Sequence, residues 1–540
     1  MNQKYNFIKY ILCVVFSISF CISCYDDKGN YDYNDINEIE IEGIEEEYSL
    51  RMEELLTIKP ILKSSIQGNE ANYKYQWIFL SIQIDKKLYY NYTFSNDKYL
   101  EDVWLQLPGG SYTAYYKITD TSTGIEWVSK NFKISISDEI ASGILVLSDV
   151  NDKARVDFIS YFNNELTLKL DVLSIINSEY PDFGKPLSLS CYSDNNSPKM
   201  GATVEDGRYA VTILTNTGAY RLHPGNFTYD PLYNLNYVFI GNPSDDFIAM
   251  RIAEGGYLID NSNNVYLYNY TYSTYWTVGI YVNTTVDSKY INVSPMIGAV
   301  TPTSSYGGIV MYDTDNKSFI YQRGSFIKYS SYFSTSLEQT FNELEFKMNN
   351  TGKDLLYLFC RETEASVSMP KIYCILKDPV TEELFIGSFE FGNTIKQTMY
   401  AKIPLVDSEN IREFAMGQNI SKTGNLNPFL YYRTDNKVYV YNINDGDNKV
   451  VYTAPDNNII TTMKFLGNSR NVSSSSEWLE DLMIATYDPA KPANSCGKLE
   501  VMKVTPLYGD LNINEYNEEK MEWTGFGKIV DIEWKSRSNQ

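Results

Sequence analysis

Histidine is almost absent from this sequence, since His223 is the single one among 540 residues. Ser-His-Asp triads, general base catalysis by histidine and zinc sites with several histidines mostly need more than one such side chain can supply. His223 lies between Leu222 and Pro224, so we expect it to end a strand rather than to act in catalysis. The composition therefore favours a protein that is not an enzyme, and we expect no cofactor.

Familiar catalytic and metal-binding signatures are missing as well. The sequence has no P-loop, no GxGxxG and no GxSxG. Residues 313–316 and 444–448 are rich in Asp and Asn but lack the spacing and terminal glutamate of an EF-hand, so we interpret both as turns. Glu362 and Glu364 have the residue type of a glycosidase pair, but a solvated turn is the simpler interpretation. We expect no metal site.

Cysteine is scarce, and three of the seven residues fall within the first 24 positions. The others are Cys191, Cys360, Cys374 and Cys496, and none of these four forms a CxxC pair typical of zinc sites. Cys360 and Cys374 lie on successive expected strands, so they are candidates for a disulfide. Buried thiols are the alternative.

Positive charge is in deficit, with 46 Lys and Arg against 68 Asp and Glu and a net charge of −22. Such a surface repels nucleic acid and anionic lipid headgroups. We therefore expect no nucleic acid partner, and we interpret the acidic excess as a means of staying soluble at a crowded surface.

The apolar run at the N-terminus, residues 10–22, is shorter than the roughly 20 residues that a membrane-spanning helix needs. Lys4 and Lys9 precede it and Cys24 follows it, which is the pattern of a secretory signal. We expect residues 1–23 to be removed and Cys24 to be acylated as in bacterial lipoproteins, with outer-membrane lipid as the partner of the acyl chains. A cut at Cys21 and an ordinary signal with an incidental cysteine are the alternatives.

Residues 24–37 are polar and rich in turn formers, so we expect a lipidated cysteine followed by a flexible tether. Within this segment, Asp26-Asp27 resembles the acidic export signal of surface lipoproteins in Bacteroidetes. That resemblance implies a lipid-anchored protein of the outer membrane that faces the cell exterior.

Aromatic residues are abundant, with 47 Tyr and 25 Phe, which favours strands over helices. Between residues 38 and 138, short alternating apolar segments are separated by turn residues, as in an antiparallel β-sandwich. Trp77 stands in the middle of the expected strand 73–78, at the place where an immunoglobulin-like sandwich buries a core tryptophan. We therefore expect residues 38–138 to form a sandwich around Trp77.

Three segments of this sandwich carry a family resemblance: YxYxW at 73–77, LPGGxY at 107–112 and ITD at 118–120. With the leader CYDDKGNYDY they resemble the PKD-like family of Bacteroidetes lipoproteins over about residues 20–160. The resemblance implies a PKD-like fold and a surface lipoprotein of the kind found beside SusC/SusD-like importers. It brings no catalytic residues.

Residues 139–540 repeat one unit, a hairpin of aromatic and β-branched residues around an Asp, Asn or Gly turn. The clearest copy is PFLYYRTDNKVYVYN, residues 428–442. The others lie at 144–159, 209–222, 257–268, 308–321, 355–376 and 482–504. Successive turns are about 56 residues apart on average, which predicts a β-propeller or an array of repeats.

The two ends of this region complement each other. Residues 528–534 resemble an inner strand with no hairpin after it, and residues 143–147 begin a hairpin with no inner strand before it. We expect them to pair and to close a propeller of seven blades, because closure removes two exposed sheet edges. Inner strands for the other blades are expected at 200–204, 247–252, 296–300, 344–348, 414–416 and 459–466. Eight blades is the alternative, because 166–191 and 268–290 contain further strand-like residues.

One aromatic group in the propeller is a candidate ligand site. Alternate residues of a strand share a face, and exposed rings offer flat platforms for sugars or peptide side chains. The candidates are Tyr268, Tyr270, Tyr272, Tyr275 and Trp276. The alternative is that these rings pack between blades as ordinary core.

From these features we expect a non-enzymatic surface lipoprotein. Its sandwich would act as a spacer, and its propeller would bind glycan or peptide for a SusC/SusD-like nutrient uptake system. The alternatives are a propeller enzyme, either a glycan lyase or a hydrolase, and a purely structural subunit of the importer complex.

Overall fold

The computed structural model describes most of residues 37–535. Outside the description lie residues 1–36 and 536–540, and the longest internal gaps are 193–209, 235–246, 276–289, 324–334, 337–346, 362–370, 418–427 and 466–479. The described part is almost entirely β-structure, with one short α-helix, α2 (Val172–Ile175), and two 3-10 turns at Glu70–Asn72 and Ser408–Asn410. None of the described helices is long and apolar enough to cross a membrane. The all-β fold class expected from the sequence is confirmed.

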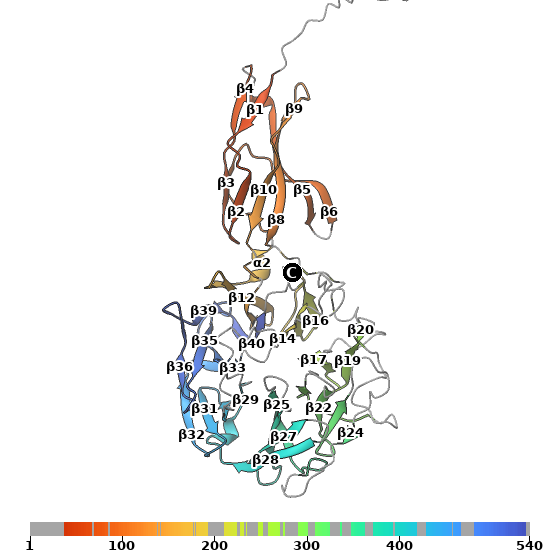
Figure 1. The fold of residues 1–540 in the computed structure, drawn as a ribbon, viewed down its shortest axis with the longest axis vertical. Coiled ribbons are helices and arrows are strands. Elements are labelled where there is room, and N and C mark those ends of the chain that lie inside the picture. Colours follow the sequence, from red (N-terminus) through yellow and green to blue (C-terminus); the bar gives the residue numbers. More distant parts are fainter. Residues whose placement is uncertain are drawn as a thin grey trace, which may run out of the picture.

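The first ten strands form an elongated sandwich, coloured red to orange in Figure 1. They are β1 (Ile39–Glu42), β2 (Glu47–Leu50), β3 (Leu56–Ile58), β4 (Ile61–Ser64), β5 (Tyr73–Ile84), β6 (Lys87–Ser95), β7 (Leu100–Val103), β8 (Gly110–Asp120), β9 (Glu126–Val128) and β10 (Phe132–Ile136). The large sheet has the order β2-β10-β8-β5-β6, with β9 added to β8, and the pairs β1-β4 and β3-β7 form two smaller sheets. Ile39, Leu56 and Leu100 of the small sheets belong to the same buried core as Trp77 of the large one. The strands therefore enclose one core between two layers.

Trp77 lies at the centre of this core, as the sequence predicted. Its side chain is 0% exposed, and its indole Nε1 donates a hydrogen bond to the carbonyl of Asp97 at 2.9 Å. The rings of Tyr116 and Phe132 lie 4.4 Å and 6.2 Å away between centroids. The buried indole N–H thus has a partner, and the large ring fills the space between the layers.

Most of the remaining described strands form seven sheets around a common centre, called the ring below (Figure 1), while β37 (Glu515–Tyr516) and β38 (Glu519–Lys520) pair with each other in a small separate sheet. Strands of the first four sheets are β11 (Gly143–Asp149), β12 (Ala154–Phe162), β13 (Glu165–Lys169), β14 (Pro186–Tyr192), β15 (Ala210–Thr215), β16 (Gly218–Leu222), β17 (Phe247–Arg251), β18 (Tyr257–Asp260), β19 (Val265–Asn269), β20 (Thr274–Tyr275), β21 (Gly298–Val300), β22 (Gly308–Asp313), β23 (Ser318–Arg323) and β24 (Thr335–Ser336). Strands of the last three, with the C-terminal strand, are β25 (Asp354–Arg361), β26 (Lys371–Lys377), β27 (Leu384–Phe391), β28 (Ile395–Ile403), β29 (Glu413–Ala415), β30 (Phe429–Arg433), β31 (Lys437–Asn442), β32 (Asn448–Thr453), β33 (Ile459–Phe465), β34 (Leu482–Tyr487), β35 (Gly497–Val504), β36 (Leu511–Ile513), β39 (Glu522–Phe526) and β40 (Lys528–Lys535).

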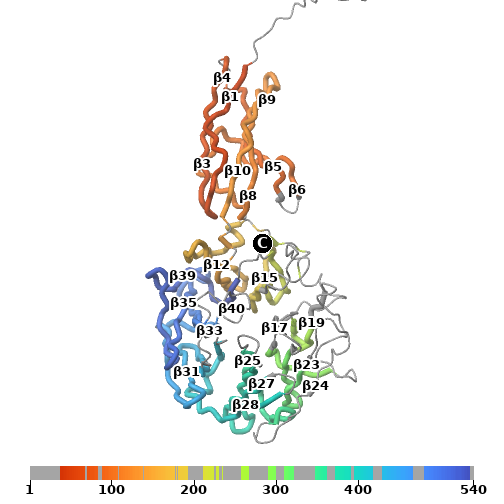
Figure 2. Tube along the Cα trace, viewed as in Figure 1, coloured from red at the N-terminus to blue at the C-terminus, as the bar shows by residue number. Residues whose placement is uncertain are grey.

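Strand order is the same in sheet after sheet. The sheets read β40-β11-β12-β13, β14-β15-β16, β17-β18-β19-β20, β21-β22-β23-β24, β25-β26-β27-β28, β29-β30-β31-β32 and β33-β34-β35-β36, the last with β39 added to β35. Figure 2 shows β40, β33, β25 and β17 close to the centre of the ring. The first strand of each sheet is therefore the inner one, and the later strands lie progressively further out.

Most of the hairpins expected from the sequence are present with their turns. In the clearest copy, β30 and β31 pair antiparallel from Phe429 opposite Asn442 to Arg433 opposite Val438. The Thr434 hydroxyl accepts a hydrogen bond from the Lys437 N–H at 3.2 Å, which stabilises the turn between them. The turn residues identified in the sequence therefore mark the tips of real hairpins.

One sheet differs from the expectation. Residues 355–376 were expected to form its outer hairpin after an inner strand at 344–348, but β25 is itself the inner strand, and β26 and β27 form the hairpin. Residues 347–350 form a turn instead, and the segment before them lies outside the described residues. The error arose because β25 and β26 are both apolar and buried, which hides the difference between an inner and a middle strand.

The described strands within the two segments that suggested an eighth blade belong to the seven sheets. Within 166–191, β13 is the outer strand of the first sheet and β14 is the inner strand of the second. Within 268–290, β20 completes the third sheet. The inner strand expected at 200–204 lies outside the described residues, and β14 occupies that position in the sheet order.

The C-terminal strand pairs with the first hairpin of the ring, as expected. β40 runs antiparallel to β11, with Gly143 opposite Lys535, Leu145 opposite Glu533 and one bulge after Leu147. On the other side, β11 pairs with β12 in its normal place. The first sheet is therefore assembled from the two ends of the region 139–540.

Neighbouring sheets are connected by a recurring contact, in which the segment entering an inner strand packs against the turns of two successive sheets. Between the first and second sheets, the Gly184 carbonyl accepts from the Ala154 N–H at 2.7 Å, and the Lys185 N–H donates to Asn216 Oδ1 at 2.7 Å. Before β40, the corresponding contact is made by Arg155, whose guanidinium donates to the carbonyls of Gly525 (2.9 Å) and Asn494 (2.8 Å). The joint between the last and first sheets thus resembles a joint inside the ring.

Candidate functional site

The aromatic residues proposed for ligand binding belong to the outer strands of the third sheet. Tyr268 of β19 lies opposite Tyr275 of β20 in the strand register. Both strands are separated from the ring centre by β17 and β18. Tyr270, Tyr272 and Trp276 lie outside the described residues. The two described members are therefore away from the centre, and a ligand site here stays a prediction.

The neighbouring Tyr266 is a core residue. Its side chain is 2% exposed, and its hydroxyl donates a hydrogen bond to Asp260 Oδ2 at 2.9 Å. Asp260 Oδ1 also accepts from the N–H groups of Ser262 and Asn264, each at 2.9 Å. The ring of Tyr266 is thus used to pack the sheet, and its hydroxyl stabilises the adjacent turn.

Charged side chains meet at the centre of the ring, between the inner strands β33 and β40. Lys464 Nζ lies 3.2 Å from Asp531 Oδ1 and 2.5 Å from Glu533 Oε2. The three side chains, called the central charge cluster below, are 25%, 18% and 14% exposed. Because Asp531 and Glu533 alternate along β40, both carboxylates are on one face of that strand and reach the same lysine.

The central charge cluster extends to the second sheet through Asp531. Its Oδ2 accepts a hydrogen bond from the backbone N–H of Leu189 at 2.8 Å and lies 3.4 Å from the Ser188 hydroxyl, both in β14. One carboxylate therefore connects inner strands of three sheets. Inner strands have an open backbone edge toward the ring centre, and a carboxylate is a suitable acceptor for an N–H on that edge.

The same arrangement recurs between the sixth and seventh sheets. Glu413 of β29 accepts from the backbone N–H of Met463 and from the Thr462 hydroxyl, both at 3.1 Å and both in β33. Arg433 donates to Glu413 at 2.8 Å and to the carbonyls of Ile460 and Thr461. Acidic residues of one inner strand thus bind the backbone of the next, and the centre of the ring is both polar and structurally constrained.

These groups offer hydrogen-bond chemistry at a partly exposed centre. The lysine is paired with two carboxylates, and the Ser188 hydroxyl and the Leu189 N–H beside them donate to Asp531. A few converging polar groups of this kind suit a polar ligand such as a sugar or a peptide.

His223 lies elsewhere, immediately after β16 in the second sheet. Its backbone N–H donates to the Thr228 carbonyl at 2.9 Å, and its carbonyl accepts from the Phe227 N–H at 2.8 Å. Burial, together with the nearby Lys535 cation, lowers the pKa of the His223 imidazole, which is therefore neutral at pH 7. The residue ends a strand, as the sequence predicted.

The Asp-rich segments that resemble calcium loops are turns. Asp313 Oδ1 accepts from the N–H groups of Asp315 (3.0 Å) and Asn316 (2.9 Å), and its Oδ2 accepts from the Asn316 side chain at 2.8 Å. In the second segment, Asp445 Oδ1 accepts from the Asp447 N–H at 3.0 Å. Among the residues that the structure describes, no three or more His, Cys, Asp or Glu side chains gather as metal ligands.

The proposed disulfide between Cys360 and Cys374 is not present, which corrects that possibility in favour of buried thiols. Both side chains are buried in one core cluster, as thiols. The register places Cys360 opposite Ile372 and Cys374 opposite Leu358, so the two cysteines are diagonal neighbours rather than a direct pair. Burial raises the pKa of Cys374 to about 12, so this thiol is unreactive at neutral pH.

The proposed lipidation residue Cys24 and the export residues Asp26 and Asp27 lie outside the described residues, so all three remain predictions. The central charge cluster was not predicted from the sequence. Its signal was present in residues 528–534, where Asp531 and Glu533 interrupt an otherwise apolar inner strand. Lys464 gave no comparable signal, because a single lysine in a strand is ordinary.

Comparison with known proteins adds the family of the N-terminal part. Residues 24–183 match the family described as PKD-like. The match covers less than a third of the 540 residues, so the family is assigned to this part of the chain alone. The PKD-like match runs beyond the sandwich into β11, β12, β13 and α2 of the ring. No curated protein sequence matches the chain significantly.

Solved structures with a similar arrangement are distant. An auxiliary nutrient binding protein from Bacteroides thetaiotaomicron VPI-5482 has a TM-score of 0.34 at 10% identity, covering 84% of this chain and 96% of its own. One from Bacteroides ovatus ATCC 8483 has a TM-score of 0.26 at 7% identity, covering 77% and 86%. The extracellular domain of the one component system BT4673 from B. thetaiotaomicron has a TM-score of 0.32 at 16% identity, and the match covers 65% of this chain but 40% of that one. Likenesses this distant assign neither a ligand nor an activity to this chain.

Proposed function

We propose that this chain is a cell-surface lipoprotein that binds a glycan or peptide nutrient for a SusC/SusD-like uptake system. In this proposal the PKD-like sandwich holds a closed seven-bladed β-propeller away from the outer membrane, and the propeller binds the ligand without transforming it. The anchor is the acylated Cys24, and the tether includes the export residues Asp26 and Asp27.

The observation that carries the proposal is the arrangement of the two ends of the sandwich. Figure 1 shows the ring beside one end, near α2 and β12, whereas the chain enters through β1 at the opposite end. A protein anchored through residues before β1 would therefore present its ring at the greatest distance from the lipid. That geometry suits capture of a ligand from the surroundings.

The propeller interpretation is supported by three features of the ring. Seven sheets in the described residues share one strand order, β40 completes the first sheet by pairing with β11, and the joint before β40 uses the same kind of turn contact as the others. A closed ring leaves no unpaired end sheet, which protects edges that would otherwise aggregate.

The centre of the ring is our preferred place for the ligand. The central charge cluster is partly exposed, and it combines Lys464 with two carboxylates and the Ser188 hydroxyl. Propellers gather the inner strands of all blades around one axis, so a ligand there is contacted by several sheets at once. The outer aromatic group around Tyr268 and Tyr275 is the other proposed place.

The test is binding of the purified mature protein to panels of glycans and of peptides, measured by calorimetry, with product analysis of the same mixtures. Lys464→Met should weaken binding at least tenfold if the ligand occupies the centre. Lys498→Met is a matched control, because Lys498 is also paired with two carboxylates and is 23% exposed, but lies in β35. Equal loss in both variants would contradict the central site, and appearance of cleaved product would overturn the binding-only function.

A further inference from the structure

The loop between β2 and β3 inserts a side chain of the sandwich into the core of the ring. Met52 at the tip of this loop is 5% exposed. It belongs to the buried cluster that includes Leu145, Phe158 and Leu173 of the ring, and not to the sandwich core around Trp77. Because Met52 is flexible and apolar, it can fill a socket formed by another part of the chain.

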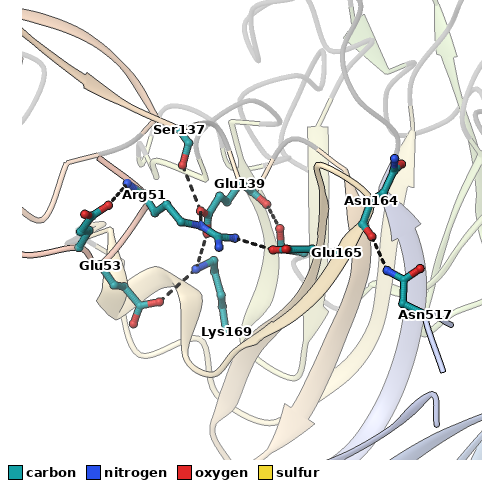
Figure 3. Close-up of polar contacts among 10 residues, drawn as sticks. Arg51, Glu53, Ser137, Glu139, Asn164, Glu165, Lys169 and Asn517 are labelled. Atoms are coloured by element: carbon teal, nitrogen blue, oxygen red, sulfur yellow. Dashed lines mark hydrogen bonds and ion pairs between the residues drawn. The ribbon is translucent and has the colours of Figure 1, made fainter. Parts of the chain in front are cut away.

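Charged residues on both sides of Met52 hold the loop in place. Arg51 Nε lies 2.8 Å from Glu139 Oε1, and Glu53 Oε2 lies 3.1 Å from Lys169 Nζ. Glu139 and Lys169 also pair directly at 2.8 Å, and their side chains are only 2% and 3% exposed. Figure 3 shows these four side chains converging, with the Ser137 hydroxyl donating to Glu139 as well.

Two opposing effects act on the pKa of the Glu139 carboxyl at this contact: burial and hydrogen bonding from cations. Burial by itself would raise the pKa, but hydrogen bonds from Lys169 and Arg51 outweigh it and lower the pKa below its usual value. Glu139 is therefore ionised at neutral pH. Moving the loop away would leave two buried charges with fewer partners, which is strongly unfavourable.

The connection between sandwich and ring is bound to the ring through its backbone. Lys535, the last residue of β40, is 0% exposed and donates from Nζ to the Ile140 carbonyl at 2.9 Å. The Ser160 hydroxyl donates to the Glu139 carbonyl, and the Tyr161 N–H donates to the Ser142 carbonyl at 2.8 Å. Strands from both ends of the ring thus hold the connecting segment.

We infer that the sandwich and the ring form a single rigid arm, locked by Met52, by the Arg51–Glu139–Lys169–Glu53 ion cluster and by the C-terminal strand. Domains joined within one chain move relative to each other unless their interface is large or strongly bonded. Here the interface has an apolar plug surrounded by buried ion pairs. The ring consequently keeps one fixed direction relative to the sandwich. This inference concerns the arm itself and does not depend on any ligand.

The test is a distance distribution between spin labels on the full mature chain. Labels at Thr123→Cys, in the exposed β8–β9 turn, and Val380→Cys, which is 87% exposed, report the two parts. The native thiols Cys191, Cys360, Cys374 and Cys496 are buried and do not compete, and Cys24→Ala removes the acylated one. Wild type is compared with Met52→Ala, with Arg51→Ala and with Met52→Ala/Lys169→Met. Leu55→Ala on the same loop is the control, because Leu55 is 51% exposed.

A rigid arm gives one narrow distribution in wild type and in Leu55→Ala. The double variant should widen it at least twofold, and the two single variants should widen it less. Circular dichroism checks that each variant is folded. If the variant with Lys169→Met does not fold, the distance distribution of Arg51→Ala tests the inference instead, because Arg51 is half exposed and its removal should be tolerated. A broad wild-type distribution overturns the inference, and so does a distribution that stays narrow in every folded variant.

Discussion

The carboxylate of Asp531 accepts a hydrogen bond from the backbone N–H of Leu189 at 2.8 Å, although 342 residues separate them in the chain. Asp531 belongs to β40 and Leu189 to β14, so the contact connects the inner strands of the first and second sheets. The same carboxylate pairs with Lys464 of the seventh sheet. β40 is therefore bonded on both sides, to β14 of the second sheet and to Lys464 of the seventh, and is a structural member of the ring.

Ending the chain at Thr524 should destabilise the whole ring and promote aggregation. The deletion removes Ile529, Ile532 and Trp534, which are buried and each contribute about 1.5–3 kcal/mol, and it exposes the edge of β11 that pairs with β40. We expect a lower melting temperature for the entire ring and oligomers by light scattering, while the sandwich stays folded around its own core. A chain that ends after Lys535 is the control. If the shorter chain melts like the control, the closed ring is wrong.

Trp77→Ala should cost about 3–5 kcal/mol of sandwich stability, because it leaves a large cavity and removes the hydrogen bond to Asp97. The unfolding transition of the ring should hardly change, since its cores do not include Trp77. Chemical denaturation and differential scanning calorimetry measure the stabilities of the sandwich and of the ring. Trp104→Ala is the control at a 40% exposed position, with an expected effect within about 0.5 kcal/mol. Equal losses of stability in the two variants would contradict a central position of Trp77 in the sandwich core.

Asp481 should make stability depend on pH between about 4 and 7. Burial raises the pKa of this carboxyl to about 7, and its Oδ2 accepts from Asn514 Nδ2 at 2.5 Å. The folded protein therefore holds a proton that the unfolded chain releases near pH 4, so this residue costs stability increasingly as the pH rises through that window. Asp481→Asn should become more stable relative to wild type across the window by up to about 4 kcal/mol. Above about pH 7 the difference should level off.

Chemical denaturation at a series of pH values measures this difference. Asp447→Asn, in an exposed turn, is the control and should give no such trend. A constant difference between Asp481→Asn and wild type at all pH values would show that the carboxyl does not titrate in this range.

Cys24→Ala should abolish acylation and release the protein from the membrane or leave it as precursor. Labelling with palmitate and membrane fractionation measure both effects. Cys21→Ala is the matched control, because Cys21 is the competing cysteine at the end of the apolar run. Unchanged palmitate labelling of Cys24→Ala, or loss of labelling in Cys21→Ala alone, would show that Cys24 is not the acylated residue and would favour Cys21.

Local residue patterns predicted the sandwich core and most hairpins because their causes are local. Trp77 stands in an alternating strand, and Thr434 and Asp313 stand where a turn needs a side chain to accept backbone N–H groups. The pairing of β40 with β11 was also predictable, because each end lacked what the other had. The inner strand of the fifth sheet was not, since β25 is apolar on both faces like its neighbour.

The contact between sandwich and ring left no pattern in the sequence. Arg51, Met52 and Glu53 form an ordinary polar loop with one apolar residue, and Lys169 ends an ordinary strand. Their roles arise only when residues more than 80 positions apart are brought together, as for Arg51 and Glu139. The aromatic group around Tyr268 is the reverse case. Its pattern is clear in the sequence, but ligand binding there is still a prediction.

The socket for Met52 also bears on how such chains can be recombined. A ring cut from its sandwich near residue 139 would keep an empty apolar hole and a lysine deprived of Glu53, so the boundary between the two folds is a poor place for a genetic exchange. An exchange after residue 183 would instead move the loop together with both charged partners and with Leu145, Phe158 and Leu173 of its socket. The family match ends at that position. The inherited module would then be the sandwich with β11, β12, β13 and α2 attached, a unit that carries part of its own docking surface into whatever ring it joins.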